Sequence, residues 1–161
     1  MKKILYLLFI GSFISCSSVQ NYTKNDLDLS YYQDKKLAFQ LTSTGVQYVN
    51  MEGAYMGITE QPNFDETFAE AVDEMAKETN LNLRTDIYPN SNIDVKVLDA
   101  TWKFGLSSAE LTTKINFHTS FGNYESIGRF KNASGGSKTK SLKKSFKNAI
   151  YNFLLDYQKR K

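Results

Sequence analysis

The chain has 161 residues, a formal net charge of +3 and 14% aromatic residues. This length suits a single domain, and the aromatic content, with only two prolines, excludes a disordered protein. Lys2 and Lys3 supply much of the positive excess, so the rest of the chain is almost neutral and no global field favours nucleic acid as a partner.

Residues 1–15 have the layout of a secretory signal peptide. The positive start at Lys2 and Lys3 precedes an apolar run over residues 4–14, which small residues then end. Such a run rises only about 16 Å as a helix, against a hydrocarbon core of roughly 30 Å. It is therefore too short to span a bilayer well, which counts against the alternative of an uncleaved anchor.

Cys16 is the only cysteine of the chain and stands where such a leader is cleaved. The segment resembles a bacterial lipoprotein precursor, with Phe13, Ile14 and Ser15 forming a relaxed version of the motif before the cysteine. The resemblance implies that the thiol of Cys16 receives a diacylglycerol, that the leader is removed and that the new amino terminus is acylated. Several acyl chains hold a protein durably on a membrane. Ordinary signal-peptide cleavage without an anchor is the other alternative.

We expect residues 16–34 to form a lipidated tether and residues 35–161 a single α+β domain. The tether is polar, although Tyr31 and Tyr32 could dock part of it on the domain. No acidic cluster follows the cysteine, which favours an outer-membrane location facing the periplasm.

Alternating apolar residues predict a strand over 36–42 and a weaker strand over 46–51, paired as a hairpin around Gly45. Glycines indicate a loop over 52–62. Asn63, with Glu66 three residues later, predicts the N-terminal cap of a helix that ends near Asn80.

A short strand is predicted over 81–87, followed by three long strands in an antiparallel meander with its last turn at Gly122–Asn123. In the first long strand the apolar alternation changes phase at Leu98, which predicts a β-bulge and places Leu98 on the inner face. Phe121 is expected to point inward from the second strand. A flexible linker over 132–140 and a helix over 141–158 complete the chain.

This order predicts an α+β fold with a mostly antiparallel sheet of about five strands and two helices packed on one face. In architecture it resembles small periplasm-facing outer-membrane lipoproteins, among them auxiliary lipoproteins of transport systems, the lipopolysaccharide-assembly lipoprotein and the amino-terminal module of TolB. The resemblance implies a protein that acts by binding partners.

The candidate catalytic residues do not form a known motif. His118 is the only histidine, and Asp94 and Asp99 point to opposite faces of a regular strand unless a bulge realigns them. The candidate nucleophiles lack a catalytic context: Ser107, Ser108 and Ser134. Residues 135–138 lack the spacing of a phosphate-binding loop. We therefore expect no enzyme, no cofactor and no metal site.

The most distinctive surface feature is a basic run before and within the last helix. Its members are Lys138, Lys140, Lys143, Lys144 and Lys147. They are expected to face outward, where they could meet an anionic protein or glycolipid; alternatively they complement the acidic helix near residues 63–80.

We therefore expect a membrane-anchored, non-catalytic binding or assembly module of the cell envelope. The alternative is a small-ligand or lipid binder with a pocket between sheet and helices. The residues expected to line that pocket are Phe64, Phe68, Trp102, Phe104 and Phe146.

Overall fold

A computed structural model of the protein describes residues 26–43, 48–53, 57–60, 62–87, 89–133 and 136–159. The predicted leader, Cys16, the turn at Gly45 and Ser134 lie outside these residues. The described elements are, in chain order, α2 (Leu29–Tyr32), β1 (Leu37–Ser43), β2 (Tyr48–Gly53), β3 (Gly57–Glu60), α3 (Phe64–Thr79), β4 (Leu83–Thr85), β5 (Ile93–Phe104), β6 (Ser108–Thr119), β7 (Gly122–Ala133) and α4 (Lys138–Tyr157).

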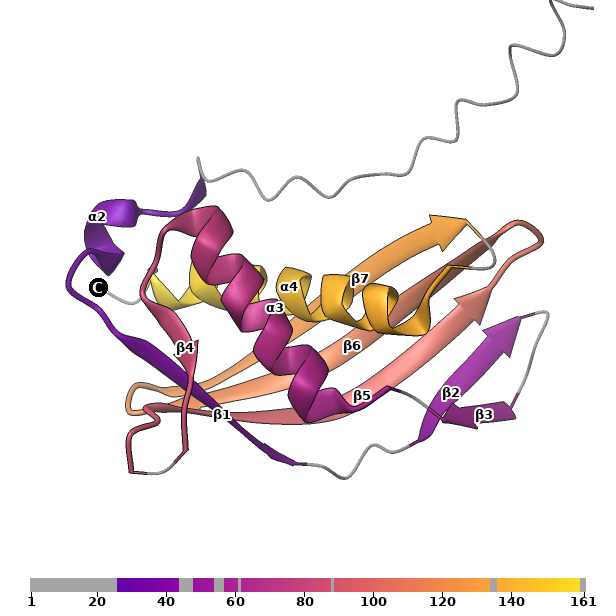
Figure 1. The fold of residues 1–161 in the computed structure, drawn as a ribbon, viewed down its shortest axis with the longest axis horizontal. Helices are drawn as coiled ribbons and strands as arrows, with labels where there is room; N and C mark the ends of the chain where they lie inside the picture. The colour runs from indigo at the N-terminus through magenta and orange to yellow at the C-terminus, as the bar shows by residue number, and fades with distance from the viewer. Residues whose placement is uncertain are drawn as a thin grey trace, which may run out of the picture.

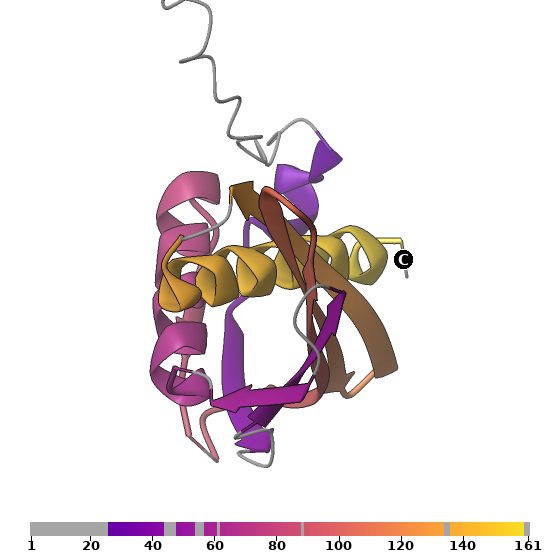
Figure 2. The ribbon, with the colours of Figure 1, turned by 90° about the vertical axis from the view of Figure 1, so that its right-hand side faces the viewer.

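These elements form a mixed α+β fold in which α3 and α4 lie on one face of a sheet (Figure 1). The described strands make one seven-stranded sheet. Figure 2 shows α4 crossing the sheet and α3 standing at a steep angle to α4. The short α2 packs at the C-terminal end of α4.

The sheet is mixed, so the prediction of a mostly antiparallel sheet was wrong. β5, β6 and β7 form the predicted antiparallel meander. The other edge of β5 is shared, because β1 runs parallel beside Ile93–Lys96 and β2 runs parallel beside Thr101–Phe104. β4 then pairs parallel with β1, and β3 pairs antiparallel with β2.

The expected hairpin between the first two strands is therefore also wrong. β1 and β2 follow one another in the same direction along β5, and their partner lies some fifty residues later in the sequence. The expected loop over 52–62 contains β3, which is the true antiparallel partner of β2. The short strand β4 ends at Thr85, and Ile87 beyond it is 72% exposed.

The predicted β-bulge in β5 is confirmed between Val97 and Asp99. The extra residue is Leu98, which is 41% exposed, so its predicted inward position was wrong. The bulge resets the alternation, and Val97 and Ala100 on either side of it are both buried.

The turn between β6 and β7 comes two residues earlier than predicted. Thr119 pairs with Gly122, which leaves Ser120 and Phe121 as the turn residues. Phe121 is 63% exposed there, so its expected inward position was wrong. Gly122 has a φ of 120°, a backbone conformation that favours glycine.

Helix α3 follows its predicted boundaries. The side chain of Asn63 accepts hydrogen bonds from the backbone N–H groups of Asp65 and Glu66, and Asn80 ends the helix with a φ of 57°. The predicted apolar stripe is buried: Phe64, Phe68, Ala71, Val72, Met75 and Thr79. Local capping and helical periodicity together explain this element.

Helix α4 begins at Lys138, capped by Ser137, which is three residues earlier than predicted. With β7 continuing to Ala133, the expected linker over 132–140 is shorter than predicted. The predicted apolar stripe of this helix is buried: Leu142, Phe146, Ala149, Ile150, Phe153, Leu154 and Tyr157.

Small residues let α4 approach the sheet closely. A side chain at Gly128 of β7 would bring its Cβ to 1.9 Å from the carbonyl oxygen of Ser145. Beside this contact the hydroxyl groups of Thr113 and Ser145 share a buried hydrogen bond of 2.8 Å. The backbone of α4 therefore rests directly on β7 at Gly128.

Two asparagines of α4 cover the outer edge of β7. The backbone N–H of Arg129 donates to Oδ1 of Asn148 over 2.8 Å. Nδ2 of Asn152 donates to the carbonyl oxygen of Ile127, also over 2.8 Å. Backbone groups that would otherwise remain open at the sheet edge are thereby satisfied.

Candidate functional site

The structure divides the predicted lysine patch into two groups. Lys138 and Lys140 are exposed in the first turn of α4, and Lys144 is half-buried. Lys143 and Lys147 instead turn toward α3, where the acidic residues Glu70, Glu74 and Glu78 lie at successive helical turns. The five lysines therefore do not act as one surface patch.

Lys147 was predicted to face outward, but its side chain is fully buried. Its Nζ lies 3.1 Å from a carboxylate oxygen of Glu74 and 2.5 Å from one of Glu78. A buried ammonium group is tolerated only when carboxylates pair with it, and α3 supplies two. The prediction was wrong because the carboxylates of the neighbouring helix α3 determine where the side chain of Lys147 lies, and the pattern within α4 does not reveal them.

Lys143 extends the same cluster toward solvent. Its Nζ lies 2.7 Å from Glu74 and 3.1 Å from Glu70. The hydrogen bond to Glu74 raises the pKa of Lys143, and burial opposes this only in part. Partial burial tends to raise the pKa of Glu74, but the hydrogen bonds from Lys143 and Lys147 outweigh it, and the pKa is lower than usual. The ion pairs of this cluster thus connect α3 and α4.

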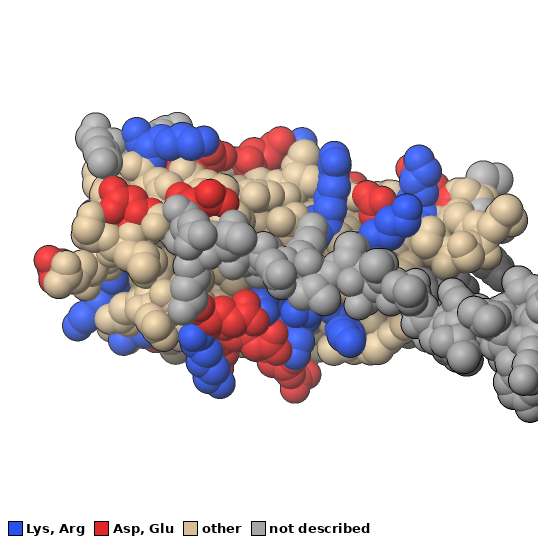
Figure 3. All heavy atoms as spheres, turned by 90° about the horizontal axis from the view of Figure 1, so that it is seen from above, with Lys and Arg blue, Asp and Glu red and all other residues tan. Residues whose placement is uncertain are grey.

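Three lysines of α4 help to line a shallow hollow of about 390 Å³ near the start of the helix. Its lining residues are Glu74, Ser137, Thr139, Lys140, Lys143 and Lys144. On the face seen in Figure 3, basic and acidic side chains are interleaved and neither sign forms a continuous field. An anionic group would meet exposed lysine here, but with Glu74 close by.

The outer face of the sheet holds the candidate catalytic residues, and among them Asp94 and His118 are direct neighbours across β5 and β6. The bulge does bring Asp94 and Asp99 to the same face, since they pair with His118 and Lys114 of β6. These partners are four residues apart, or about 14 Å along a strand. Catalytic carboxylate pairs lie within about 5–10 Å of each other, so this pair does not form such a dyad.

The serine candidates are equally isolated. Ser108 begins β6, and His118 stands ten residues later on the same strand, about 34 Å away. His118 is exposed, and its Nδ1 lies 2.9 Å from Oδ1 of Asn123. In the part of the chain that the structure describes, histidine, cysteine and acidic side chains form no group of three that could hold a metal ion.

The aromatic residues predicted to line a pocket are packed mainly against one another. Phe146 contacts Phe64 and Phe68, with ring centroids 5.7 and 5.5 Å apart. Trp102 stacks on Phe104 at 5.7 Å. Of these five residues, Phe68 alone lines one of the hollows described below.

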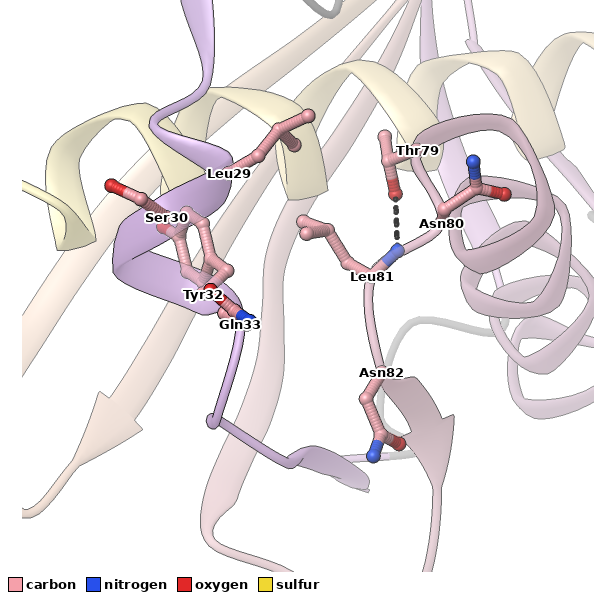
Figure 4. A pocket seen from close by; sticks show the side chains of 8 residues that line it. All are labelled: Leu29, Ser30, Tyr32, Gln33, Thr79, Asn80, Leu81 and Asn82. Carbon is pink, nitrogen blue, oxygen red and sulfur yellow. Dashed lines mark hydrogen bonds between the residues drawn. The ribbon is translucent and has the colours of Figure 1, made fainter.

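Two further hollows lie at the edges of the core. The first, of about 510 Å³, lies between α2 and the C-terminal end of α3 (Figure 4). It is lined by Leu29, Ser30, Tyr32, Gln33, Thr79, Asn80, Leu81 and Asn82. The second, of about 470 Å³, lies between α3 and the strands β1 and β4; we call it the β1 groove. Its lining residues are Phe39, Gln40, Leu41, Asp65, Phe68, Ala69, Thr85, Asp86 and Ile87.

The end of the predicted tether packs on the domain, and Tyr31 and Tyr32, which the sequence indicated for this role, contribute to the contact. Leu27 and Tyr32 are buried, and Tyr31 and Tyr32 both donate to carbonyl oxygens of α4. The side chain of Gln158 bonds to the backbone of this segment twice, donating to the carbonyl oxygen of Asp26 and accepting from the N–H of Asp28. We call residues 26–33 the N-terminal strap.

Within the described ranges, no helix combines the length and the apolar character needed to cross a bilayer.

No family model and no curated protein matches the chain. Among solved structures, a protein from Xanthomonas campestris assigned to the family model DUF330 is 10% identical, with a TM-score of 0.43 over 77% of this chain and 81% of that chain. An uncharacterised protein is 4% identical, with a TM-score of 0.38 over 78% and 98%. Neither likeness assigns a fold or a function.

Proposed function

We propose that this chain is a lipid-anchored protein of the bacterial cell envelope that works by binding a partner and not by catalysis. The observation that carries the proposal is Cys16, the only cysteine, which stands directly after a secretory leader. The distance of Ser108 from His118 along β6 and the separation of Asp94 from Asp99 support the non-catalytic part of the proposal.

The N-terminal strap supports the proposal because it determines which part of the domain an anchor on Cys16 would hold near the membrane. Cys16 and Asp26 are ten residues apart, a length of chain that reaches at most about 35 Å. Asp26 is held at α4 by Tyr151, whose hydroxyl donates to its carboxylate over 3.0 Å. An anchor on Cys16 would therefore keep the C-terminal end of α4 within about 35 Å of the bilayer.

The exposed lysines lie at the opposite end of the same helix. A 20-residue helix is about 30 Å long, and Lys138 and Lys140 are in its first turn. We propose that an anionic envelope protein or glycolipid binds at this end, where Lys140 is exposed. We place the protein at the outer membrane, facing the periplasm, because no acidic cluster follows Cys16 in the sequence.

The β1 groove favours a second function, the binding of a small apolar ligand or lipid. Its lining includes the apolar residues Leu41, Ala69 and Ile87, and its volume is in the range of small-molecule sites. Mass spectrometry of the protein released from native membranes distinguishes the two functions, since a co-purifying lipid in fixed ratio supports the second.

The anchor itself is tested by growing cells with labelled palmitate and by measuring the mass of the mature amino terminus. We expect label in the wild-type protein, and an acylated cysteine as its first residue. Cys16→Ser serves as the control and should lose both the label and the membrane fraction. A mature protein with an unmodified thiol, or one that begins at another residue, would refute the anchor.

A further inference from the structure

The edge of β1 loses its partner strand after three residues. β4 pairs with Leu37–Phe39 and ends at Thr85. Farther along the same edge of the sheet, β3 covers β2 from Tyr48 onward. Between them, among the residues that the structure describes, no strand pairs with the outer side of residues 41–43. We call this stretch of about three residues, or roughly 10 Å, the notch.

The backbone of β1 presents hydrogen-bonding groups to this notch. The carbonyl oxygen of Phe39 faces the β4 side, where it accepts from the N–H of Asp86 over 2.9 Å. Backbone groups of alternate residues in a strand point to the same side, so the N–H and the carbonyl of Leu41 also face the notch. A segment lying beside Leu41 would continue the pairing that β4 begins.

The notch opens into the β1 groove, which would receive the side chains of such a segment. Its lining includes Leu41 and Ala69, which are half-buried, beside the fully buried Phe39 and Phe68. Ile87 stands at its margin with 72% of its surface exposed. An apolar side chain of a bound segment would cover this surface, whose burial is favourable.

The acidic side chains that line the groove favour a bound segment that carries a positive charge. Asp65 is exposed in the first turn of α3, and Asp86 pairs with Arg84 at 3.2 Å. The groove lining contains no basic residue, and of its two acids Asp65 has no ion-pair partner among the described residues. A segment with a lysine or arginine beside its apolar residue would match it. A lipid tail would contact the apolar lining of the groove, but it would offer no hydrogen-bonding partner to the backbone N–H and carbonyl of Leu41.

We propose that the β1 groove binds an extended, basic and apolar segment of a partner protein, which adds to the edge of β1 as a short strand. This mode gives affinity through backbone hydrogen bonds and specificity through alternate side chains. The proposal rests on the proposed function, that this chain works by binding a partner, and it assigns a basic segment to the β1 groove, a place separate from the lysines at the start of α4.

The test selects random heptapeptides displayed on phage against the full-length protein as cells produce it. We expect enriched peptides with alternating apolar residues and at least one lysine or arginine. A synthetic copy of the best peptide should bind at least tenfold more weakly to Ile87→Ser. Leu106→Ser is the matched control, because Leu106 is fully exposed at the turn between β5 and β6, outside the groove.

Methylated peptides separate strand addition from simple burial. Methylation of a backbone nitrogen that faces β1 should weaken binding about tenfold, whereas methylation of the next nitrogen should change it little. The proposal is overturned if no peptide is enriched, if Ile87→Ser binds as well as the wild type, or if both methylated peptides bind alike. Loss of palmitate binding in Ile87→Ser, with no peptide enriched, would assign the groove to lipid. Since Cys16 takes no part in these measurements, their failure is distinct from failure of the anchor.

Discussion

Tyr32 donates a 2.5 Å hydrogen bond to the carbonyl oxygen of Leu154, which lies 122 residues farther along the chain. The contact is buried and joins the N-terminal strap to the C-terminal half of α4. Burial is the main cause that raises the pKa of Tyr32, so the phenol stays protonated and keeps its donor role. The N-terminal strap and the C-terminal half of α4 are thus part of one packed unit.

We predict that Tyr32→Phe lowers the free energy of unfolding by about 1 kcal/mol, because a buried hydrogen bond is lost while the ring remains. Urea unfolding measures the change. Tyr31→Phe is the matched control, since its hydroxyl lies 3.4 Å from the carbonyl of Tyr157 and contributes less. Equal losses in the two variants would contradict the importance of the Tyr32 contact.

Gly128→Ala should destabilise the fold by about 1–3 kcal/mol, because the new methyl group forces α4 away from β7. The built Cβ also lies 2.8 Å from the hydroxyl oxygen of Thr113, so neither side has room. Gly105→Ala is the control, as its nearest neighbour would be the hydroxyl of Ser108 at 3.4 Å. Thermal unfolding of both variants checks this, and equal melting temperatures would count against the close helix–strand approach.

We predict that removing the two carboxylates around Lys147 lowers the free energy of unfolding more than removing the buried ammonium group itself. Glu74→Gln combined with Glu78→Gln removes both carboxylates that α3 supplies to the buried Lys147, which should cost at least roughly 2 kcal/mol. Lys147→Met keeps the packing of the stem, and Glu74 and Glu78 still reach water, so it should cost about 1 kcal/mol or less. Urea unfolding of the two variants decides. A larger loss for Lys147→Met would show that the ion pairs, and not the avoided desolvation, dominate.

Stability should fall in acid through Glu74. Its pKa in the folded protein is below the ordinary value of 4.5, so its contribution is present above that value and is lost as the pH falls through the folded pKa. Lys143 has a raised pKa, so its contribution is complete below 10.5 and is lost as the pH rises through the folded pKa. Urea unfolding over a pH series tests both, and Glu74→Gln should flatten the acid limb. An unchanged acid limb in that variant would refute the role of Glu74.

Local signals were enough to predict both long helices and the bulge. The cap at Asn63 and the apolar stripe of α3 are encoded within one stretch of sequence, as is the phase change at Leu98. The start of α4 was predicted too late because Gly135, Gly136 and the serines beside them indicated a flexible linker that continued to Lys140. Ser137 nevertheless caps the helix.

Features that depend on distant segments were missed. β2 pairs with β5, and no local pattern distinguishes this from a hairpin with β1. Lys147 is buried only because Glu74 and Glu78 lie on the helix beside it. Their matching four-residue spacings were visible in the sequence, but the crossing of the two helices was not. The β1 groove likewise exists only because β4 stops at Thr85.

The asparagines on the edge of β7 have a consequence for crowding. Proteins held on a surface meet one another far more often than proteins in free solution, and an open strand edge then promotes sheet-to-sheet aggregation. Asn148 and Asn152 occupy the central hydrogen-bonding positions of β7, so neighbouring copies cannot join there as a continuous ribbon. If the proposed anchor gathers many copies on one membrane, these two amides help to keep them separate.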